Sequence, residues 1–303
     1  MAGLARADHG ESSERSSVAT PVVCRSIEEL RTAVHTERMA GRSIGFVPTM
    51  GALHEGHTSL IRIANEMTDT VVVSIFVNPT QFGPTEDFDT YPRQLDTDLE
   101  ACRNSGAQIV FTPTKEQIYP GASFFSIRIQ QLADHLCGAS RPGFFNGVVQ
   151  VVNKLFNIIQ PDLAVFGQKD YQQFRILERM VEEFHQPVQM VMAPIVRAND
   201  GLALSSRNAY LSREQRRIAP GLYRSLRFIQ QQLLNGVTVP ARLIEHQKEE
   251  LRGKGFEIDY LGVYSAQTMQ PLERISDEEL LLAGAVKLGG TRLIDNMLVK
   301  PSG

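Results

Sequence analysis

Short apolar runs alternate with helix-periodic segments between residues 43 and 195. The apolar runs occupy residues 44–47, 70–77, 108–111, 163–166 and 188–193. The run at 70–77, TVVVSIFV, is β-branched and nearly continuous, which is typical of a strand buried on both faces. Helical periodicity is clearest in Phe174, Leu177, Met180, Val181 and Phe184. The alternation predicts an α/β fold, with a doubly wound parallel sheet of the Rossmann-like type.

The pattern changes after about residue 195. Ser212 followed by Gln215 has the spacing of a capping box and predicts the start of a long helix that runs through Leu234. A second helix is expected near 241–251. Short strands are expected at 257–263, 280–288 and 291–294.

We therefore expect a Rossmann-like nucleotide-binding domain over residues 21–195 and a smaller C-terminal α+β domain over 196–303. The first twenty residues are polar and rich in serine, and they cannot bury enough surface to offset the entropy of ordering. We therefore expect residues 1–20 to form a disordered tail. They also lack the apolar core of a secretory signal, so they are not expected to be one.

Composition narrows the classes of function. With 31 Lys and Arg against 34 Asp and Glu, the net charge of -3 gives no strong attraction to nucleic acid or to an anionic membrane. No apolar run approaches the roughly 18 residues that a membrane span needs. The three cysteines form no Cys-x-x-Cys pair, and an odd number leaves one over in any set of disulfides. A reduced, cytoplasmic enzyme with small-molecule substrates is expected.

The most informative stretch is VPTMGALHEGH at residues 47–57, which joins a predicted strand to a predicted helix. Ligands of open α/β sheets bind at the carboxyl ends of the strands, where a helix N-terminus offers N–H groups to phosphate. Gly51 and Gly56 permit close approach of the backbone, and His54 and His57 could face one anion together. Two histidines on a surface turn remain the simpler alternative, and a zinc site is weaker still because the i, i+3 spacing lacks a third ligand.

Two further segments suit phosphate chemistry. Lys169, in FGQKDYQQ at 166–173, is placed at a predicted helix start with Asp170 as its N-cap, where an anionic partner would offset the unfavourable helix dipole. Ser205, Ser206 and Arg207 supply convergent hydroxyl and guanidinium donors. A solvated lysine and a polar interdomain loop are the alternatives, and position alone does not decide between the two interpretations of either segment.

Taken together, these segments make the chain resemble the pantoate–β-alanine ligase family (the pantothenate synthetases) of the HxGH nucleotidyltransferase superfamily. The similarity covers about residues 26–299 and is carried by VPTMGALHEGH, VVVSIFVNPTQF, YPR, GASRPG, KLFNIIQPD, FGQKDYQQ and DGLALSSRN. It implies a homodimer of two-domain subunits. It also implies two reactions, in which ATP and pantoate give pantoyl adenylate and pyrophosphate, and β-alanine then displaces AMP to give pantothenate.

The resemblance assigns residues to each part of this site. The implied ATP-binding residues are Met50, Gly51, His54, Gly56, His57, Gly167, Gln168, Lys169, Asp170, Val196, Leu204, Ser205, Ser206 and Arg207. Within that set, His54, His57, Lys169, Ser205, Ser206 and Arg207 are the implied catalytic residues, with His57 matching the residue usually given the acid role. Gln81 and Gln173 match the glutamines that hold pantoate, and Asn78 and Arg141 match polar groups near the acceptor end. Asp98 matches a carboxylate implicated in Mg²⁺ binding, although Thr97 stands where a second acidic residue is common.

Several positions depart from the family pattern. Cys137 replaces an acidic residue, Phe144 a histidine, Gln150 a threonine, and Gln168 and Gly262 each replace a glutamate. We expect the first four to line one pocket, which would remove proton acceptors from it. Neutral drift is one interpretation, and an amide ligase with the same adenylation step but another amine or hydroxy acid is the second. A non-catalytic nucleotide-binding protein and an enzyme that stops after nucleotidyl transfer are the remaining hypotheses.

Overall fold

The computed structural model describes residues 20–84, 86–275 and 277–300, so the predicted tail lies, except for Thr20, outside the described residues. The elements in order are β1 (Val22–Cys24), α1 (Ile27–Met39), β2 (Ile44–Thr49), α2 (Glu55–Met67), β3 (Thr70–Ile75), η1 (Pro79–Gln81), α3 (Leu95–Asn104), β4 (Ile109–Phe111), α4 (Lys115–Ile118), α5 (Leu136–Ser140), α6 (Phe144–Ile159), β5 (Leu163–Gly167), η2 (Gln168–Asp170), α7 (Tyr171–Glu183), β6 (Gln189–Ala193), η3 (Ser206–Tyr210), α8 (Arg213–Ile218), α9 (Gly221–Leu234), α10 (Ala241–Gly253), β7 (Glu257–Ser265), β8 (Leu280–Leu288) and β9 (Thr291–Val299).

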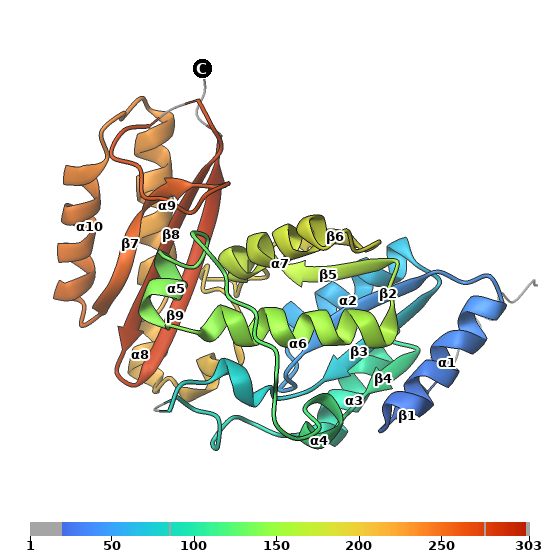
Figure 1. The fold of residues 1–303 in the computed structure, drawn as a ribbon. Coiled ribbons are helices and arrows are strands. Elements are labelled where there is room, and N and C mark those ends of the chain that lie inside the picture. The colour runs from blue at the N-terminus through green and yellow to red at the C-terminus, as the bar shows by residue number, and fades with distance from the viewer. Residues whose placement is uncertain (1–19, 85, 276, 301–303) are drawn as a thin grey trace, which may run out of the picture.

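The first part of the chain forms a six-stranded sheet in the order β1-β4-β3-β2-β5-β6 (Figure 1). Every pairing within it is parallel. The predicted α/β fold with a doubly wound parallel sheet is thereby confirmed, and β2 to β6 lie where the apolar runs predict them.

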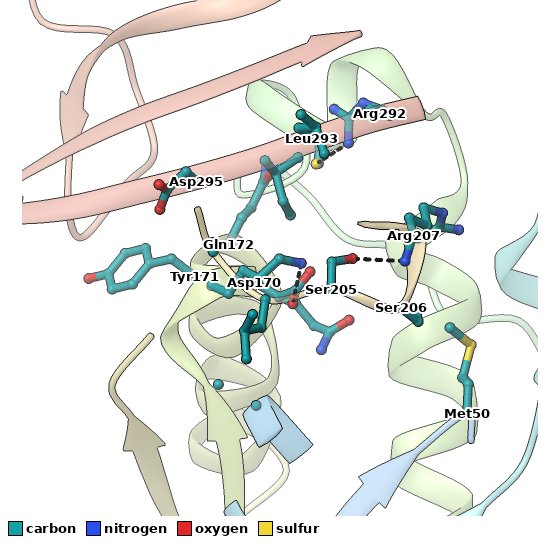
Figure 2. A pocket seen from close by; sticks show the side chains of 18 of the residues that line it. Met50, Asp170, Tyr171, Gln172, Ser205, Ser206, Arg207, Arg292, Leu293 and Asp295 are labelled. Carbon is teal, nitrogen blue, oxygen red and sulfur yellow. Dashed lines mark hydrogen bonds and ion pairs between the residues drawn. The ribbon is translucent and has the colours of Figure 1, made fainter. Parts of the chain in front are cut away.

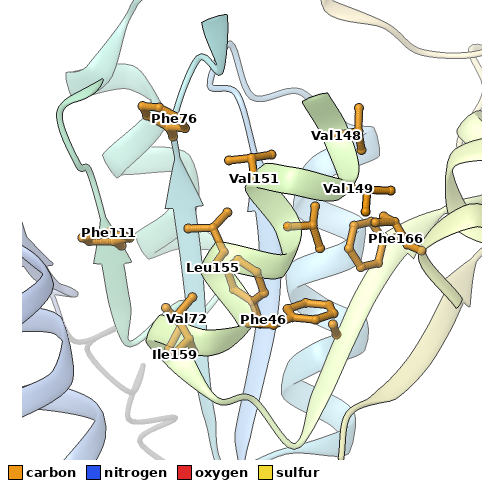
Figure 3. Close-up of a cluster of buried hydrophobic side chains, with 14 of the residues drawn as sticks. Phe46, Val72, Phe76, Phe111, Val148, Val149, Val151, Leu155, Ile159 and Phe166 are labelled. Atoms are coloured by element: carbon orange, nitrogen blue, oxygen red, sulfur yellow. The ribbon is translucent and has the colours of Figure 1, made fainter. Parts of the chain in front are cut away.

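Helices cover both faces of this sheet because its strands are apolar on both sides. Phe46 and Val72 pack with α1, α6 and α7 on one face, whereas Val47 and Val73 pack with α2 and α3 on the other. On the first face α6 packs over the strands (Figure 3), and its Phe156 ring meets Phe46 edge-on with ring centroids 6.2 Å apart. The rigid platform that results fixes the strand ends on which the site is built.

The rest of the chain builds a three-stranded antiparallel sheet, β7-β8-β9, with α9 and α10 packed on it (Figure 1). The predicted boundary near residue 195 falls between β6 and η3. The single helix predicted from Ser212 to Leu234 is wrong in one respect: the capping box of Ser212 and Gln215 is present, but α8 stops at Ile218 and α9 begins after Pro220. Proline has no N–H to continue the helical hydrogen bonds, so the chain starts a new helix there.

Strand order places the site. From β2 the chain proceeds to β3 and β4 on one side of the sheet, whereas β5 and β6 lie on the other side. The loops that leave β2 and β5 therefore diverge, which opens a crevice at the carboxyl ends of these two paired strands. Among the described residues, no helix is long and apolar enough to span a membrane.

Candidate active site

A cavity of about 1180 Å³ lies at these strand ends, and the C-terminal sheet forms its opposite wall. The loop after β2, the η2 turn after β5 and the segment Leu204–Arg207 all line it. Figure 2 shows Ser205, Ser206 and Arg207 between Met50 on one side and Arg292 of β9 on the other. The volume exceeds the upper end of about 1,000 Å³ usual for one small-molecule site, so it can take more than one substrate at a time.

The loop after β2 is held from below by Asp98 of α3. One carboxylate oxygen accepts the N–H of Ala52 at 3.0 Å, and the other accepts the N–H of Leu53 at 2.7 Å. Gly51 precedes them with a φ of +81°, a conformation in which a side chain would be strained and would also meet Asp98. Asp98 is 1% exposed, so its charge stabilises the loop and does not line the cavity.

His54 and His57 open helix α2 as a capping pair. The Nδ1 atom of His54 accepts the N–H of Gly56 at 3.1 Å, and Nδ1 of His57 accepts the N–H of His54 at 3.3 Å. Their ring centroids are 4.1 Å apart. Because each Nδ1 is an acceptor, each neutral ring carries its proton on Nε2 and keeps that N–H as a donor for a ligand.

Burial lowers the pKa of both histidines. Desolvation, followed by the positive charge of Lys169, lowers the pKa of His54 to about 4. Desolvation, the neighbouring His54 and Lys169 lower the pKa of His57 to about 3. The pair is therefore neutral near pH 7, and in this state it offers hydrogen-bond donors, not imidazolium charges.

Lys169 is placed by the η2 turn and by a residue of the other sheet. The amide Nδ2 of Asn296 on β9 donates to the carbonyl oxygens of Gln168 and Lys169, both at 2.9 Å. The Lys169 ammonium lies 3.9 Å from a carboxylate oxygen of Asp170. Asp170 occupies the N-cap position of α7 as predicted, but it makes no side-chain capping hydrogen bond.

The third segment comes from the loop between β6 and α8. The backbone of Leu204 donates to the carbonyl of Val196 at 3.0 Å, which closes a turn, and Ser205 Oγ accepts the N–H of Arg207 at 3.3 Å. The hydroxyl of Ser206 lies 3.5 Å from that of Tyr91. All of these residues line the same cavity as His57 and Lys169.

Four polar residues predicted to bind the acid and the amine also line the cavity: Asn78, Gln81, Arg141 and Gln173. Asn78 is 1% exposed, and its amide donates to Gln81 Oε1 at 3.0 Å and to the Gly147 carbonyl at 3.1 Å. Asn78 therefore orients Gln81, whose own amide nitrogen lies 3.0 Å from the sulfur of Met50.

The expectation that four departures share one pocket is wrong for two of them. Cys137 and Phe144 line the cavity, whereas Gln150 and Gln168 do not. Gln168 turns toward β9, where its amide donates to Asn296 Oδ1 at 3.2 Å. Arg292 donates to Cys137 Sγ at 3.3 Å and forms an ion pair with Asp259, so its charge stays paired without an acidic residue at position 137.

Some residues that line the cavity were not predicted from the sequence, and some predicted residues lie next to the cavity without lining it. Gly51, Gln168 and Asp98 do not line the cavity, although the first and last shape the histidine loop and Gln168 contacts β9. Residues that line it without having been predicted include Glu86, Asp87, Tyr91, Asp259, Arg292 and Asn296. Within the described residues, no three His, Cys, Asp or Glu side chains gather as a metal site, and both oxygens of Asp98 already accept N–H bonds.

Fold and site together define a nucleotide-binding α/β enzyme of the HxGH class, with paired histidines, a lysine and an arginine around one crevice at the strand-order switch. The sequence profile of the pantoate-beta-alanine ligase family matches residues 22–298. The chain belongs to this family.

Individual relatives agree with that assignment. The chain is 50% identical over 275 residues to the pantothenate synthetase of Pseudomonas fluorescens (strain Pf-5), covering 90% of this chain and 96% of that protein. The crystal structure of pantothenate synthetase from Thermus thermophilus superposes with a TM-score of 0.85 at 41% identity, over 92% of this chain and 100% of the other. The pantoate-beta-alanine ligase of Francisella tularensis, crystallised with beta-gamma ATP and beta-alanine, gives a TM-score of 0.78 at 33% identity, over 92% and 97%.

Proposed function

We propose that this chain ligates pantoate to β-alanine in two steps, with ATP as co-substrate. The observation that carries the proposal is the convergence of the loop after β2, the turn after β5 and the Leu204–Arg207 segment on one cavity. Hydroxyl, imidazole, ammonium and guanidinium donors meet there, and this donor set suits a triphosphate. The cavity volume leaves room for an acid beside the nucleotide.

In the first step, a carboxylate oxygen of pantoate attacks the α-phosphorus of ATP. The new C–O–P bond forms as the bond from the α-phosphorus to the bridging oxygen breaks, and pyrophosphate leaves with the electron pair. Negative charge grows on the leaving group, so fixed donors around it lower the barrier. The Lys169 ammonium, the Nε2–H groups of His54 and His57, and the Ser205, Ser206 and Arg207 donors fill this role.

In the second step, the neutral amine of β-alanine attacks the acyl carbon of the adenylate. The C–N bond forms, the C–O bond to AMP breaks with its electron pair leaving on the AMP phosphate, and the nitrogen loses a proton to water. Water would hydrolyse the mixed anhydride, so the wall of Phe144, Phe145 and Val148 on α6 serves to keep the acyl group dry. Gln81 and Gln173 hold pantoate, with Arg141 near the acceptor.

Magnesium would arrive on the phosphates of ATP. Asp98 does not fit as its protein ligand, because it is buried below the cavity and both its oxygens accept backbone N–H groups. No step of the reaction proposed here depends on a metal held by the protein.

A two-stage assay tests the proposal. Exchange of labelled pyrophosphate into ATP should require pantoate, and the addition of β-alanine should give one pantothenate and one AMP for each ATP consumed. A panel of other amines separates this function from that of an amide ligase with a different acceptor. Full turnover with another amine and none with β-alanine would refute it, and so would a stable nucleotidyl product without an amide.

We further propose that the chain works as a homodimer in the cytoplasm. Phe124 and Phe125 are 92% and 87% exposed, and adjacent aromatic side chains left in water are typical of an interface, here with a second copy. The three cysteines are buried free thiols, which agrees with a reducing compartment. Light scattering of the wild type and of Phe124→Ser/Phe125→Ser tests the first point, and a monomeric wild type would contradict it.

A further inference from the structure

Two neighbouring carboxylates in the cavity wall each bind an arginine from a different segment of the chain. Asp87 accepts hydrogen bonds from Nε and Nη2 of Arg207 at 3.1 and 2.8 Å. Glu86 accepts from Nε and Nη2 of Arg141 at 2.6 and 2.5 Å. Arg207 belongs to η3 in the C-terminal part of the chain, and Arg141 lies between α5 and α6. One short segment therefore contacts two parts of the cavity lining that are far apart in the sequence.

Both pairs use the same edge of the guanidinium group. The Nε and Nη2 donors take the carboxylate in a two-pronged geometry, and Nη1 of each arginine has no partner among the described residues. Arg141 is held further by the Gln81 carbonyl at 3.2 Å and by the Phe144 ring, 3.6 Å below its guanidinium carbon. Each arginine is thus fixed in orientation, and its Nη1 group is left for a ligand.

The pairs are partly shielded from water. Side-chain exposure is 17% and 27% for Arg141 and Glu86, and 31% and 25% for Arg207 and Asp87. Burial by itself raises the pKa of Asp87, but the hydrogen bond and charge of Arg207 more than offset it, so the pKa lies below its usual value. Both carboxylates remain charged near pH 7, and they neutralise two arginines that would otherwise repel each other across the pocket.

We propose that Glu86 and Asp87 are positioning residues that divide the two half-reactions between them. Asp87 aims the Nη1 group of Arg207 at the nucleotide phosphates, and Glu86 aims the Nη1 group of Arg141 at the carboxylate of the amine substrate. This inference rests on the proposed function, since it presupposes both substrates. It predicts that two adjacent residues of one loop affect different substrates.

Kinetics of the two isosteric variants test this division. Asp87→Asn should raise KM for ATP in pyrophosphate exchange about tenfold while KM for β-alanine stays within about twofold. Glu86→Gln should raise KM for β-alanine about tenfold while KM for ATP stays within about twofold. The charge-preserving variants Asp87→Glu and Glu86→Asp should recover part of each loss. Asp89→Asn is the matched control, because Asp89 is exposed on the same segment and does not line the cavity.

Two outcomes would overturn the proposal. If both variants weaken both substrates equally, the carboxylates only support the loop. If KM falls in either variant, the carboxylate competes with the ligand for arginine. Binding of a non-hydrolysable ATP analogue, measured by calorimetry, should weaken in Asp87→Asn but not in Glu86→Gln. This measurement needs no turnover, so failure of the positioning role is distinguishable from failure of the ligase function.

Discussion

The half-buried histidine pair makes the stability of this protein depend on pH in a calculable way. An unfolded histidine titrates near 6.5, whereas burial and the neighbouring His54 and Lys169 lower the pKa of folded His57 to about 3. Between these values the unfolded chain binds a proton that the folded chain refuses. Stability is therefore complete above pH 6.5 and is lost as the pH falls toward the folded pKa.

The size of the loss in the free energy of unfolding follows from the pH range crossed below the unfolded pKa. Moving from pH 7 to pH 5 crosses about 1.5 pH units below the unfolded pKa, and each unit is worth about 1.36 kcal/mol, which gives about 2 kcal/mol for His57. The ring lines an open cavity and water reaches part of it, which weakens the effect. We therefore expect a loss of stability of about 1 to 2 kcal/mol, between half of the full value and all of it.

The variant His57→Gln isolates this contribution. Glutamine does not titrate, and at the third position of a helix it can still accept the His54 N–H as part of the capping box. Urea unfolding at pH 7 and pH 5 should show the wild type losing about 1 to 2 kcal/mol more than the variant over this range. His35→Gln, exposed on α1, is the matched control. A wild-type-minus-variant difference that is the same at both pH values would refute the reasoning, and so would an NMR titration of His57 near pH 6.5.

Three other substitutions test the remaining parts of the site. Lys169→Ala should slow pyrophosphate exchange by on the order of 100-fold or more with little change in the melting temperature, because it removes a charge beside the phosphates; near-normal exchange would contradict its role. Asn296→Ala leaves the carbonyls of Gln168 and Lys169 without their donor, so it should lower both exchange activity and stability, the latter by about 1–3 kcal/mol in urea unfolding, and an unchanged variant would contradict the anchoring. Gly147→Ala would place a Cβ 2.1 Å from the Thr80 carbonyl and should destabilise by about 1–3 kcal/mol, whereas Gly253→Ala, with no neighbour within 4 Å, should not.

Much of the first sheet was predictable because its strands are buried on both faces. Such strands leave continuous apolar runs, and β2, β3 and β5 lie on those runs. The three-residue edge strand β1 has no counterpart among the predicted elements. Helix α1 was also missed, although the capping box of Ser26 and Glu29 at its start was legible in the sequence.

The candidate site was predictable only where it follows strand ends. The segments around His57, Lys169 and Arg207 combine glycine, hydroxyl and basic residues, and the strand order brings the first two together. The carboxylates Glu86 and Asp87 had no such signal, because an acidic pair in a polar loop is indistinguishable from a solvated surface until its arginine partners are placed. The role of Asn296 could not be predicted for a similar reason. The residue pattern of β9 indicates which side chains are buried, but not that Asn296 contacts the turn after β5.

The C-terminal sheet does more than close the cavity, because Asn296 on its last strand holds the lysine turn and is itself placed beside an ion pair. Asp295 is 4% exposed and paired with Arg197 at 2.5 Å, yet burial outweighs that partner and raises the pKa of the carboxyl. A pair whose desolvation is so incompletely offset adds little to stability. It does set geometry, since Asp295 Oδ1 also accepts the N–H of Asn296 at 2.8 Å, and the Asn296 amide donates to the carbonyls of Gln168 and Lys169. The position of Lys169 in the cavity therefore depends on the second part of the chain.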